Sequence, residues 1–433
     1  MKLVVLALAG AGPDLLFGDE GLATLRNVME LGSYGTLEAV APALPEPVWA
    51  AAFTGRDPAS LGIFGCGARD RLSYDAAPPL ATFAGGHDAV WDLLARAGRR
   101  SILVGLEPGP AGTAEGVIHV GSAASGAAEG VVAEALRAAA AAGEGAECPM
   151  TARSRRRFAA ARHLMATQPW DLCVVVDRGL VEVRAAGPED MDEALRDYLR
   201  DVDASLGALL ETLDGDAAVL VVAPQGVQPA AGGFRLNEWF ARRGLLARSA
   251  DGGVAWEGTT CFAEAGPAPR VHLNVRGREP RGKVAPEDYG RVRDEVTTAL
   301  RALAGADGAP DALQVLLPAI AGPHAAPTVP DAVVLLDGTA VAAVDALGDG
   351  PLAVPLDARH PDARGAFVCA SPAADARGEV EGAHLLDVVP TMLVLLGADA
   401  PSDLPGRSLA VGGSAELDEE ALLRERLSGL GYI

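Results

Sequence analysis

The sequence predicts an α/β protein: a three-layer α/β/α core with a largely parallel central sheet and a smaller inserted subdomain. Short β-branched apolar runs alternate with alanine- and leucine-rich helical stretches, which is typical of a parallel sheet covered by helices on both faces. Hydrophobic residues make up 49% of the 433 residues and charged residues 22%, as in folded globular proteins. Between about residues 248 and 331 the alternation gives way to Gly/Pro-rich pieces, where we expect the inserted subdomain.

The apolar runs bounded by Gly, Pro, Asp or Arg are predicted to be buried strands: Leu3–Leu8, Ser101–Leu106, Leu172–Val176, Ala217–Ala223, Ala332–Leu336 and Ala366–Ala370. Helices are expected at Asp19–Leu31, Ala89–Ala97, Glu129–Ala142, Arg153–Thr167, Pro188–Leu213, Leu236–Arg243, Pro286–Ala304 and His384–Leu396. This pattern divides the chain into a first part of the core (1–247), the inserted subdomain (248–331) and a second part of the core (332–433). Trp49, Trp91 and Trp239 are expected to support the core.

Charge and composition exclude several classes of partner. Lys+Arg 36 against Asp+Glu 58 gives a net charge of −22, which disfavours nucleic acid. No stretch approaches the ~20 apolar residues that span a bilayer, so no membrane partner is expected. The five cysteines contain no CxxC pair, which argues against a disulfide framework. The apolar run Leu3–Ala11 is better interpreted as a first strand than as a targeting signal. Both observations favour a cytoplasmic location. The oligomeric state stays open.

Common catalytic motifs are missing from the sequence. Gly10-Ala11-Gly12 lacks the third glycine of a dinucleotide fingerprint, because Leu15 stands there. No P-loop, GxSxG, HExxH or EF-hand sequence occurs, and no two histidines have the spacing of paired ligands on a helix. The arginines at 153, 155, 156, 157 and 162 are typical of a solvated helix face.

An ordered set of short phrases nevertheless resembles the type I phosphodiesterase/nucleotide pyrophosphatase branch of the alkaline phosphatase superfamily. The phrases cover nearly the whole chain: Gly12–Leu16, Leu31–Leu37, Pro47–Ala50, Phe53–Pro58, Gly62–Gly65, Val90–Leu94, Gly232–Trp239, Gly277–Pro280, Pro330–Asp331, Arg364–Phe367, Glu381–Thr391 and Leu430–Ile433. The resemblance implies hydrolysis of phosphate esters by two metal ions, usually zinc, and a Thr or Ser nucleophile between them. Carboxylates and imidazoles would hold those metals.

Most of the positions that the resemblance assigns to this chemistry hold unsuitable residues. Pro45 stands at the nucleophile position, and proline has no hydroxyl group. Metal-ligand positions are occupied by Ala9, Val181, Pro224 and Gln225. Only Asp177 and His360 match a ligand type, so no cofactor is expected beyond at most one weakly held metal, because stable zinc sites use three or four protein ligands.

Three hypotheses follow. The first is a catalytically inactive pseudoenzyme that binds an unknown protein or small molecule, or regulates a relative, with an apolar or neutral guest at the carboxyl ends of the strands. The second is an active phosphodiesterase with a shifted or single-metal site and a metal-bound water, in which neighbouring carboxylates supplement Asp177 and His360. Those carboxylates, each more typical of a cap, turn or solvated residue, are Asp14, Glu46, Glu182, Asp357 and Asp362. The third is a purely structural or assembly role.

Overall fold

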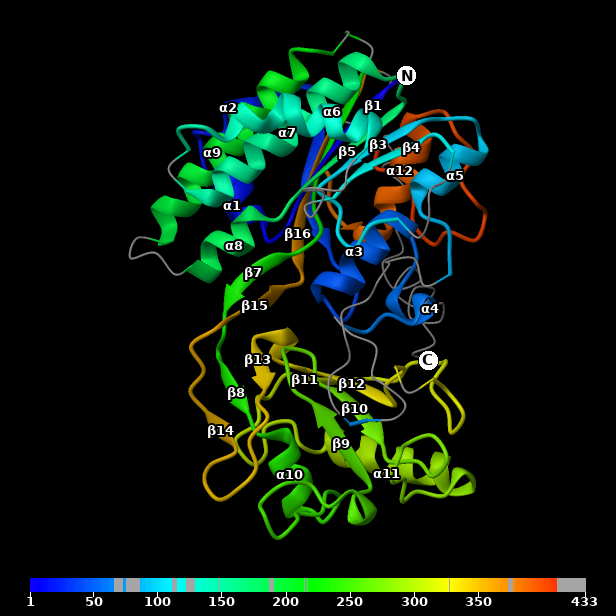
Figure 1. The fold of residues 1–433 in the computed structure, drawn as a ribbon. Helices are drawn as coiled ribbons and strands as arrows, with labels where there is room; N and C mark the ends of the chain where they lie inside the picture. Colours follow the sequence, from blue (N-terminus) through cyan, green and yellow to red (C-terminus); the bar gives the residue numbers. More distant parts are fainter. Residues whose placement is uncertain are drawn as a thin grey trace.

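The core of the molecule is one nine-stranded sheet with helices on both faces (Figure 1). The computed structural model describes residues 1–65, 73–74, 86–110, 115–121, 129–146, 148–186, 191–213, 215, 217–326, 328–372 and 377–410. The strands of this sheet are β1 Leu3–Leu8, β2 Ser33–Glu38, β3 Ser101–Val104, β4 Val117–Val120, β5 Leu172–Asp177, β6 Ala218–Ala223, β16 Arg364–Ala370, β17 Gly378–Glu379 and β18 Ala383–His384. Their order is β17-β2-β16-β6-β1-β5-β3-β4, with β18 paired to β2.

The middle of the sheet is parallel and buried on both faces. β1 runs parallel to both β5 and β6, and β3 runs parallel to β5 and β4. β16 is antiparallel to both of its neighbours, β6 and β2. Side chains along β1 alternate between two hydrophobic clusters: Leu3, Val5 and Ala7 face one side, and Val4 and Leu6 face the other. The prediction of a largely parallel sheet inside an α/β core is therefore confirmed.

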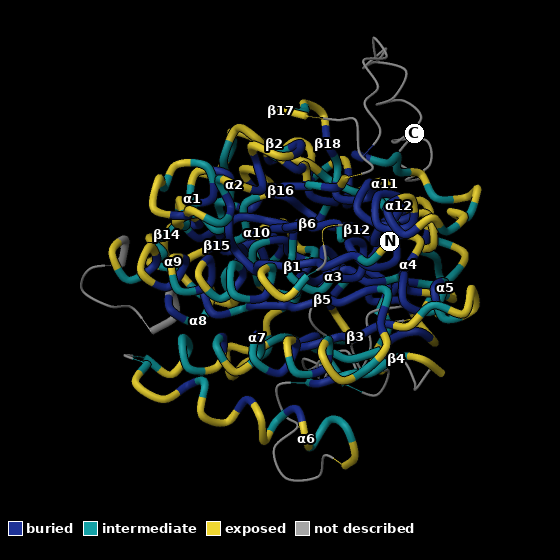
Figure 2. The backbone as a smooth tube through the Cα atoms, turned by 90° about the horizontal axis from the view of Figure 1, so that it is seen from above, coloured by how far each residue is buried: buried dark blue, intermediate teal, exposed yellow. Residues whose placement is uncertain are grey.

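Helices form the two outer layers of the core. The helices that pack on the Leu3/Val5/Ala7 face are α3 Pro45–Thr54, α4 Pro58–Leu61, α5 Val90–Arg96 and α12 Val388–Leu395. Those on the opposite face are α1 Pro13–Gly18, α2 Ala23–Leu31, α6 Gly130–Ala139, α7 Pro149–Thr167, α8 Gly179–Ala186 and α9 Met191–Leu210. Figure 2 shows the buried strands between these layers and the exposed residues on the outside. Trp49 and Trp91 are 4% and 2% exposed, as expected for core residues.

A smaller subdomain lies beyond the carboxyl ends of the central parallel strands (Figure 1). Its strands are β7 Gly226–Pro229, β8 Gly232–Phe234, β9 Cys261–Glu264, β10 Arg270–Leu273, β11 Leu313–Leu316, β12 Ala332–Leu336, β13 Val341–Ala343, β14 Ala353–Val354 and β15 Arg359–Asp362, and its helices are α10 Leu236–Arg242 and α11 Tyr289–Arg301. The chain enters along β7 and returns along β15, and these two strands pair with each other. Its hydrophobic cluster contains residues from Phe234 to Leu352. The division of the chain into domains at residues 248 and 331 stays a prediction.

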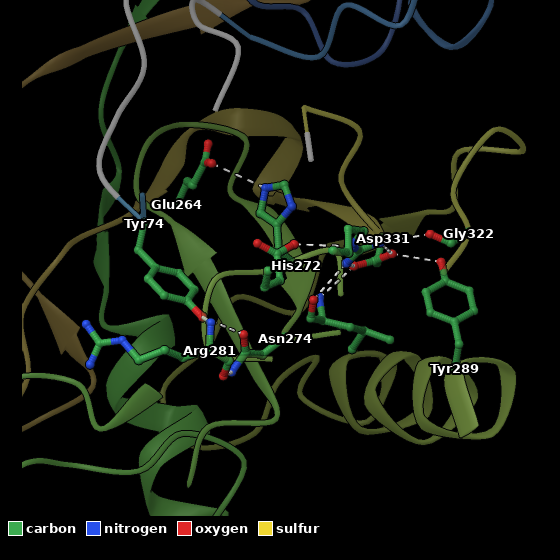
Figure 3. Close-up of polar contacts among 11 residues, drawn as sticks. Tyr74, Glu264, His272, Asn274, Arg281, Tyr289, Gly322 and Asp331 are labelled. Carbon is green, nitrogen blue, oxygen red and sulfur yellow. Dashed lines mark hydrogen bonds and ion pairs between the residues drawn. The ribbon is translucent and has the colours of Figure 1, made fainter. Parts of the chain in front are cut away.

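A buried ion pair stabilises the smaller subdomain. Arg278 donates from Nη1 to Asp331 Oδ1 at 2.9 Å and from Nη2 to Oδ2 at 2.6 Å, and each side chain is 2% exposed. The Tyr289 hydroxyl and the Leu273 backbone N–H also donate to Asp331 (Figure 3). Charges taken out of water need such saturation with hydrogen bonds. The phrases Gly277–Pro280 and Pro330–Asp331 thus carry a structural contact.

Several elements differ from the sequence prediction. The run Ala332–Leu336 forms β12 in the separate antiparallel sheet β11-β12-β10-β9, and β16 is antiparallel rather than parallel. The helix α3 is not among the helices expected from the sequence, although Pro45 and Pro47 are compatible with a helix start. Both lie in its first turn, where a missing N–H costs no intrahelical hydrogen bond. The phrase Leu430–Ile433 lies outside the described residues, and among the helices of the described residues none is long and apolar enough to cross a membrane.

We expect replacement of Arg278 to destabilise the protein strongly. Arg278→Met leaves the Asp331 carboxylate buried without its counter-ion, which costs about 3–5 kcal/mol. The matched control is Arg291→Met on α11, because Arg291 pairs with Glu295 on the surface and such pairs contribute about 0–1 kcal/mol. Urea denaturation of both variants measures the difference. Equal stabilities would show that the buried pair does not hold the subdomain.

Candidate functional site

Three of the predicted site positions meet at the carboxyl ends of neighbouring strands. Ala9 directly follows β1, and its N–H donates to the carbonyl of Asp177 at 2.8 Å. Asp177 is the last residue of β5 and lies opposite Leu8. Pro224 directly follows β6, whose Val222 lies opposite Ala7. These three positions therefore lie at the ends of neighbouring strands, and their assignment as metal-ligand positions stays a prediction.

Pro45 is the first residue of α3, where proline is well accommodated. The helix packs through Val48, Trp49 and Phe53 on the same sheet face as Ala9. Leu44, the residue before Pro45, packs partly against apolar residues of the smaller subdomain. The position that the resemblance assigns to the nucleophile thus holds a residue that suits a helix start and has no hydroxyl group.

Asp177 is directed to the other face of the sheet. Along β5, Val174 and Val176 belong to the face that carries α3, while Cys173 and Val175 belong to the face covered by α7 and α9. Asp177 follows the second set, in agreement with the alternation of side chains along a strand. Its carboxylate consequently meets residues of α7 and α9 instead of the surroundings of Pro45.

Every oxygen of the Asp177 carboxylate has a protein partner. Oδ2 accepts a hydrogen bond from Arg157 Nη1 of α7 at 3.1 Å. Oδ1 accepts from the Tyr198 hydroxyl of α9 at 2.5 Å and from the Gly179 N–H at 3.0 Å. The Asp177 side chain is 1% exposed and that of Arg157 12% exposed, so the guanidinium supplies the positive charge that a buried carboxylate requires.

The Tyr198 hydroxyl reaches Asp177 only because residue 179 has no side chain. A Cβ atom on Gly179 would lie 1.9 Å from the Tyr198 hydroxyl oxygen, a distance that no real contact shows. Burial, together with the neighbouring Asp177 charge, raises the pKa of Tyr198 well above its usual value. The hydroxyl therefore keeps its proton and acts as a donor to the carboxylate.

His360 lies on the ribbon that leads to the smaller subdomain. It is opposite Gln228, whereas Asp362 is opposite Gly226, so His360 sits two positions farther along the ribbon from the sheet. Its side chain is buried, burial lowers its pKa, and neither ring nitrogen has a partner among the described residues. The imidazole is therefore a neutral group with unused hydrogen-bonding capacity.

The remaining candidate positions do not form a cluster of metal-ligand side chains among the described residues. Val181 on α8 is 42% exposed, and Gln225 is buried, with its Oε1 lacking a partner among the described residues. The supplementary carboxylates have ordinary structural roles. Three of them lie in the first turn of a helix, where a negative charge is favourable: Asp14 in α1, Glu46 in α3 and Glu182 in α8. Asp362 pairs with Arg364, and Asp357 is exposed. Asp14 also pairs with Arg364, and Glu182 with Arg153.

The described side chains at the strand ends do not fit a centre of two metal ions. Within the described part of the chain, no three His, Cys, Asp or Glu side chains come together in a way that could hold a metal. A zinc site draws three or four ligands from these residue types. Asp177 is saturated by Arg157, Tyr198 and Gly179, and the residues at Ala9 and Pro224 offer no side-chain donor.

Comparison with known proteins assigns the family. The family model for type I phosphodiesterase/nucleotide pyrophosphatase matches residues 3–357. The chain belongs to this family. As a member of the phosphodiesterase family, it shares its fold with murine ectonucleotide pyrophosphatase/phosphodiesterase 5, at 16% identity and a TM-score of 0.57 over 93% of this chain and 96% of that one.

Two further structures share this phosphodiesterase-family fold. Human ectonucleotide pyrophosphatase/phosphodiesterase 5 is 13% identical with a TM-score of 0.59, over 94% of this chain and 97% of that one. Phosphonoacetate hydrolase from Sinorhizobium meliloti 1021, solved with phosphonoacetate, is 16% identical with a TM-score of 0.62, over 92% and 96%. A search by sequence among curated proteins gives no match. The likeness to these solved structures therefore agrees with the family assignment at the level of the fold.

The partners of Asp177 were not found from the sequence. Arg157 was expected on a solvated helix face, which is wrong, because its guanidinium is largely buried against Asp177. It lies 20 residues before Asp177 in the chain, and Tyr198 lies 21 residues after it. One signal was available: Gly179 shortly follows the strand and has no side chain, so a neighbouring group can approach its backbone closely.

We expect Asp177 to matter for stability. Asp177→Asn leaves the Arg157 guanidinium without its counter-charge in a buried setting and should lower the free energy of unfolding by about 3 kcal/mol. Asp14→Asn is the matched control, because the Asp14 side chain is 81% exposed and its pairing with Arg364 should contribute less than about 1 kcal/mol. Urea denaturation compares the two variants. An Asp177→Asn protein as stable as the control would contradict a structural role for this carboxylate.

Proposed function

We propose that this chain is a catalytically inactive member of the phosphodiesterase family, which uses the hydrolase fold to bind a partner or ligand or to regulate a relative. The pairing of Asp177 with Arg157 is the observation that supports this most strongly. A carboxylate that would hold a metal in an active relative is here neutralised by a guanidinium. The charge that the family's metal would supply is therefore not needed for the fold.

The residue at the nucleophile position supports the same proposal. Covalent phosphoryl transfer needs a hydroxyl, thiol or comparable group, and Pro45 has none. Murine ectonucleotide pyrophosphatase/phosphodiesterase 5 has also been solved in complex with AMP as an inactive variant, in which one threonine is replaced by alanine. In that relative, loss of a single hydroxyl-bearing residue is enough to remove activity.

We infer the binding role from the apolar residues at the strand ends. Ala9 and Pro224 directly follow β1 and β6 and are apolar, so a site at these strand ends would accommodate a neutral or apolar guest more easily than a phosphate. Ligands of open α/β sheets bind at the carboxyl ends of the strands, where these positions lie. We further propose that the guest is a protein or small molecule rather than nucleic acid, given the net charge of −22, and that the protein works in the cytoplasm.

The test is turnover of bis(p-nitrophenyl) phosphate in the presence of Zn²⁺ or Mn²⁺. We expect no rate above background from the wild-type protein, and none from Pro45→Thr, because a hydroxyl alone supplies no activating metal. Asp177→Asn and His360→Ala, purified in the same way, separate a real site from contamination. A contaminating phosphatase gives the same rate in all preparations. Saturable turnover that both variants lose would overturn the proposal in favour of an active single-metal phosphodiesterase.

A further inference from the structure

Tyr74 connects the core to the smaller subdomain. It lies in the chain between α4 and α5. Leu61 of α4 and Trp91 of α5 belong to the hydrophobic core of the sheet. Its ring, however, stacks on Trp256 of the smaller subdomain, with ring centroids 3.5 Å apart and an interplanar angle of 3°. Phe262 meets the same ring edge-on at 5.6 Å. Tyr74 is thus held between aromatic rings of the smaller subdomain, while α4 and α5, which precede and follow it in the chain, belong to the core.

The hydroxyl group of Tyr74 is recognised through both of its hydrogen-bonding functions. It donates to Asn274 Oδ1 at 2.8 Å and accepts from the backbone N–H of Arg281 at 3.0 Å (Figure 3). A hydroxyl can satisfy both groups at once, because it is donor and acceptor together. A phenylalanine ring in the same place would leave the Asn274 oxygen and the Arg281 N–H without this partner.

Asn274 is fixed in the orientation that this recognition requires. Its side chain is fully buried, and Nδ2 donates to the carbonyls of Trp256 at 2.7 Å, Thr259 at 2.9 Å and Arg281 at 3.1 Å. These contacts tie the loops around Trp256 and Arg281 together and direct Oδ1 toward Tyr74. The groups that receive the ring and the hydroxyl are therefore organised by contacts within the smaller subdomain itself.

Tyr74 adds to the attachments that the described residues make between the two subdomains. The covalent connections are β7 and β15, which form a ribbon of two strands. The second attachment is a small apolar cluster in which Ala59 and Phe64 of the core pack with Val333 and Leu335 of β12. Two-stranded ribbons are weak on their own, so the noncovalent contacts decide how firmly the subdomains stay together.

We propose that Trp256, Phe262, Asn274 and Arg281 form a phenol-binding socket, and that Tyr74 occupies this socket to hold the smaller subdomain against the core. The ligand class is an aromatic ring that carries one hydroxyl group. Stacking on Trp256 supplies affinity, and the pair of hydrogen bonds supplies selectivity for the hydroxyl. The site is separate from the strand ends and independent of whether the chain hydrolyses phosphate esters.

Recognition by the socket is tested by chemical rescue. Tyr74→Ala should lower Tm by about 5 °C, because it removes a stacked ring and two hydrogen bonds. Added p-cresol should raise the Tm of Tyr74→Ala but not that of the wild-type protein, and toluene should raise it much less, since it cannot satisfy Asn274 and Arg281. Tyr34→Ala is the control. Tyr34 lies edge-on to Phe17 within the core, and no described residue bonds to its hydroxyl, so p-cresol and toluene should act on that variant alike.

The holding role needs its own measurement. Small-angle X-ray scattering should give a larger radius of gyration for Tyr74→Ala than for the wild-type protein, and p-cresol should not reverse this, because free p-cresol fills the socket without linking it to the core. If Tyr74→Ala fails to fold, Tyr74→Phe should show faster hydrogen exchange at the Arg281 N–H. Equal rescue by toluene and p-cresol, or unchanged Arg281 exchange in Tyr74→Phe, would overturn the recognition, and unchanged scattering would overturn the holding role.

Discussion

A carboxylate buried at the end of a central strand needs a positive charge beside it, and this requirement organises the region around Asp177. Arg157 of α7 meets the requirement, and Tyr198 of α9 completes the shell of donors. Gly179 in turn has to lack a side chain so that the Tyr198 hydroxyl can approach. Strand β5 and helices α7, α8 and α9 are thereby joined through one carboxylate on the sheet face away from Pro45.

The residues that maintain the fold are different from the residues at the strand ends. Arg278 and Asp331, from two of the phrases shared with the family, form the buried pair of the smaller subdomain. Glu238, within a third phrase, pairs with Arg242 and Arg248 while almost completely buried. Asp387, in a fourth, accepts from the backbone N–H groups of His384 and Arg407. These contacts stabilise the fold independently of which residues stand at the strand ends. The fold alone therefore does not establish an activity.

The sequence predicted the α/β fold, because buried apolar runs alternate along it with helical stretches. The parallel register of β1, β5 and β6 then places Ala9, Asp177 and Pro224 at neighbouring strand ends. The sequence did not predict where the Asp177 side chain points, since its partners lie 20 and 21 residues away on helices whose packing no local pattern specifies. For the same reason Arg157 was assigned to a solvated face. The contacts of Tyr74 were equally hidden, because Trp256 and Asn274 are far from it in sequence and join it only through the tertiary fold.

We propose that this member of the phosphodiesterase family holds no pair of metal ions, and the metal content of the purified protein tests this most directly. The protein is equilibrated with excess Zn²⁺ or Mn²⁺, freed of unbound ion and analysed for metal per chain. Our account predicts no tightly bound metal, because Arg157 already neutralises Asp177 and the neighbouring strand ends offer no ligands. Two tightly bound metal ions per chain would contradict it and would restore the hydrolase as the function of this fold.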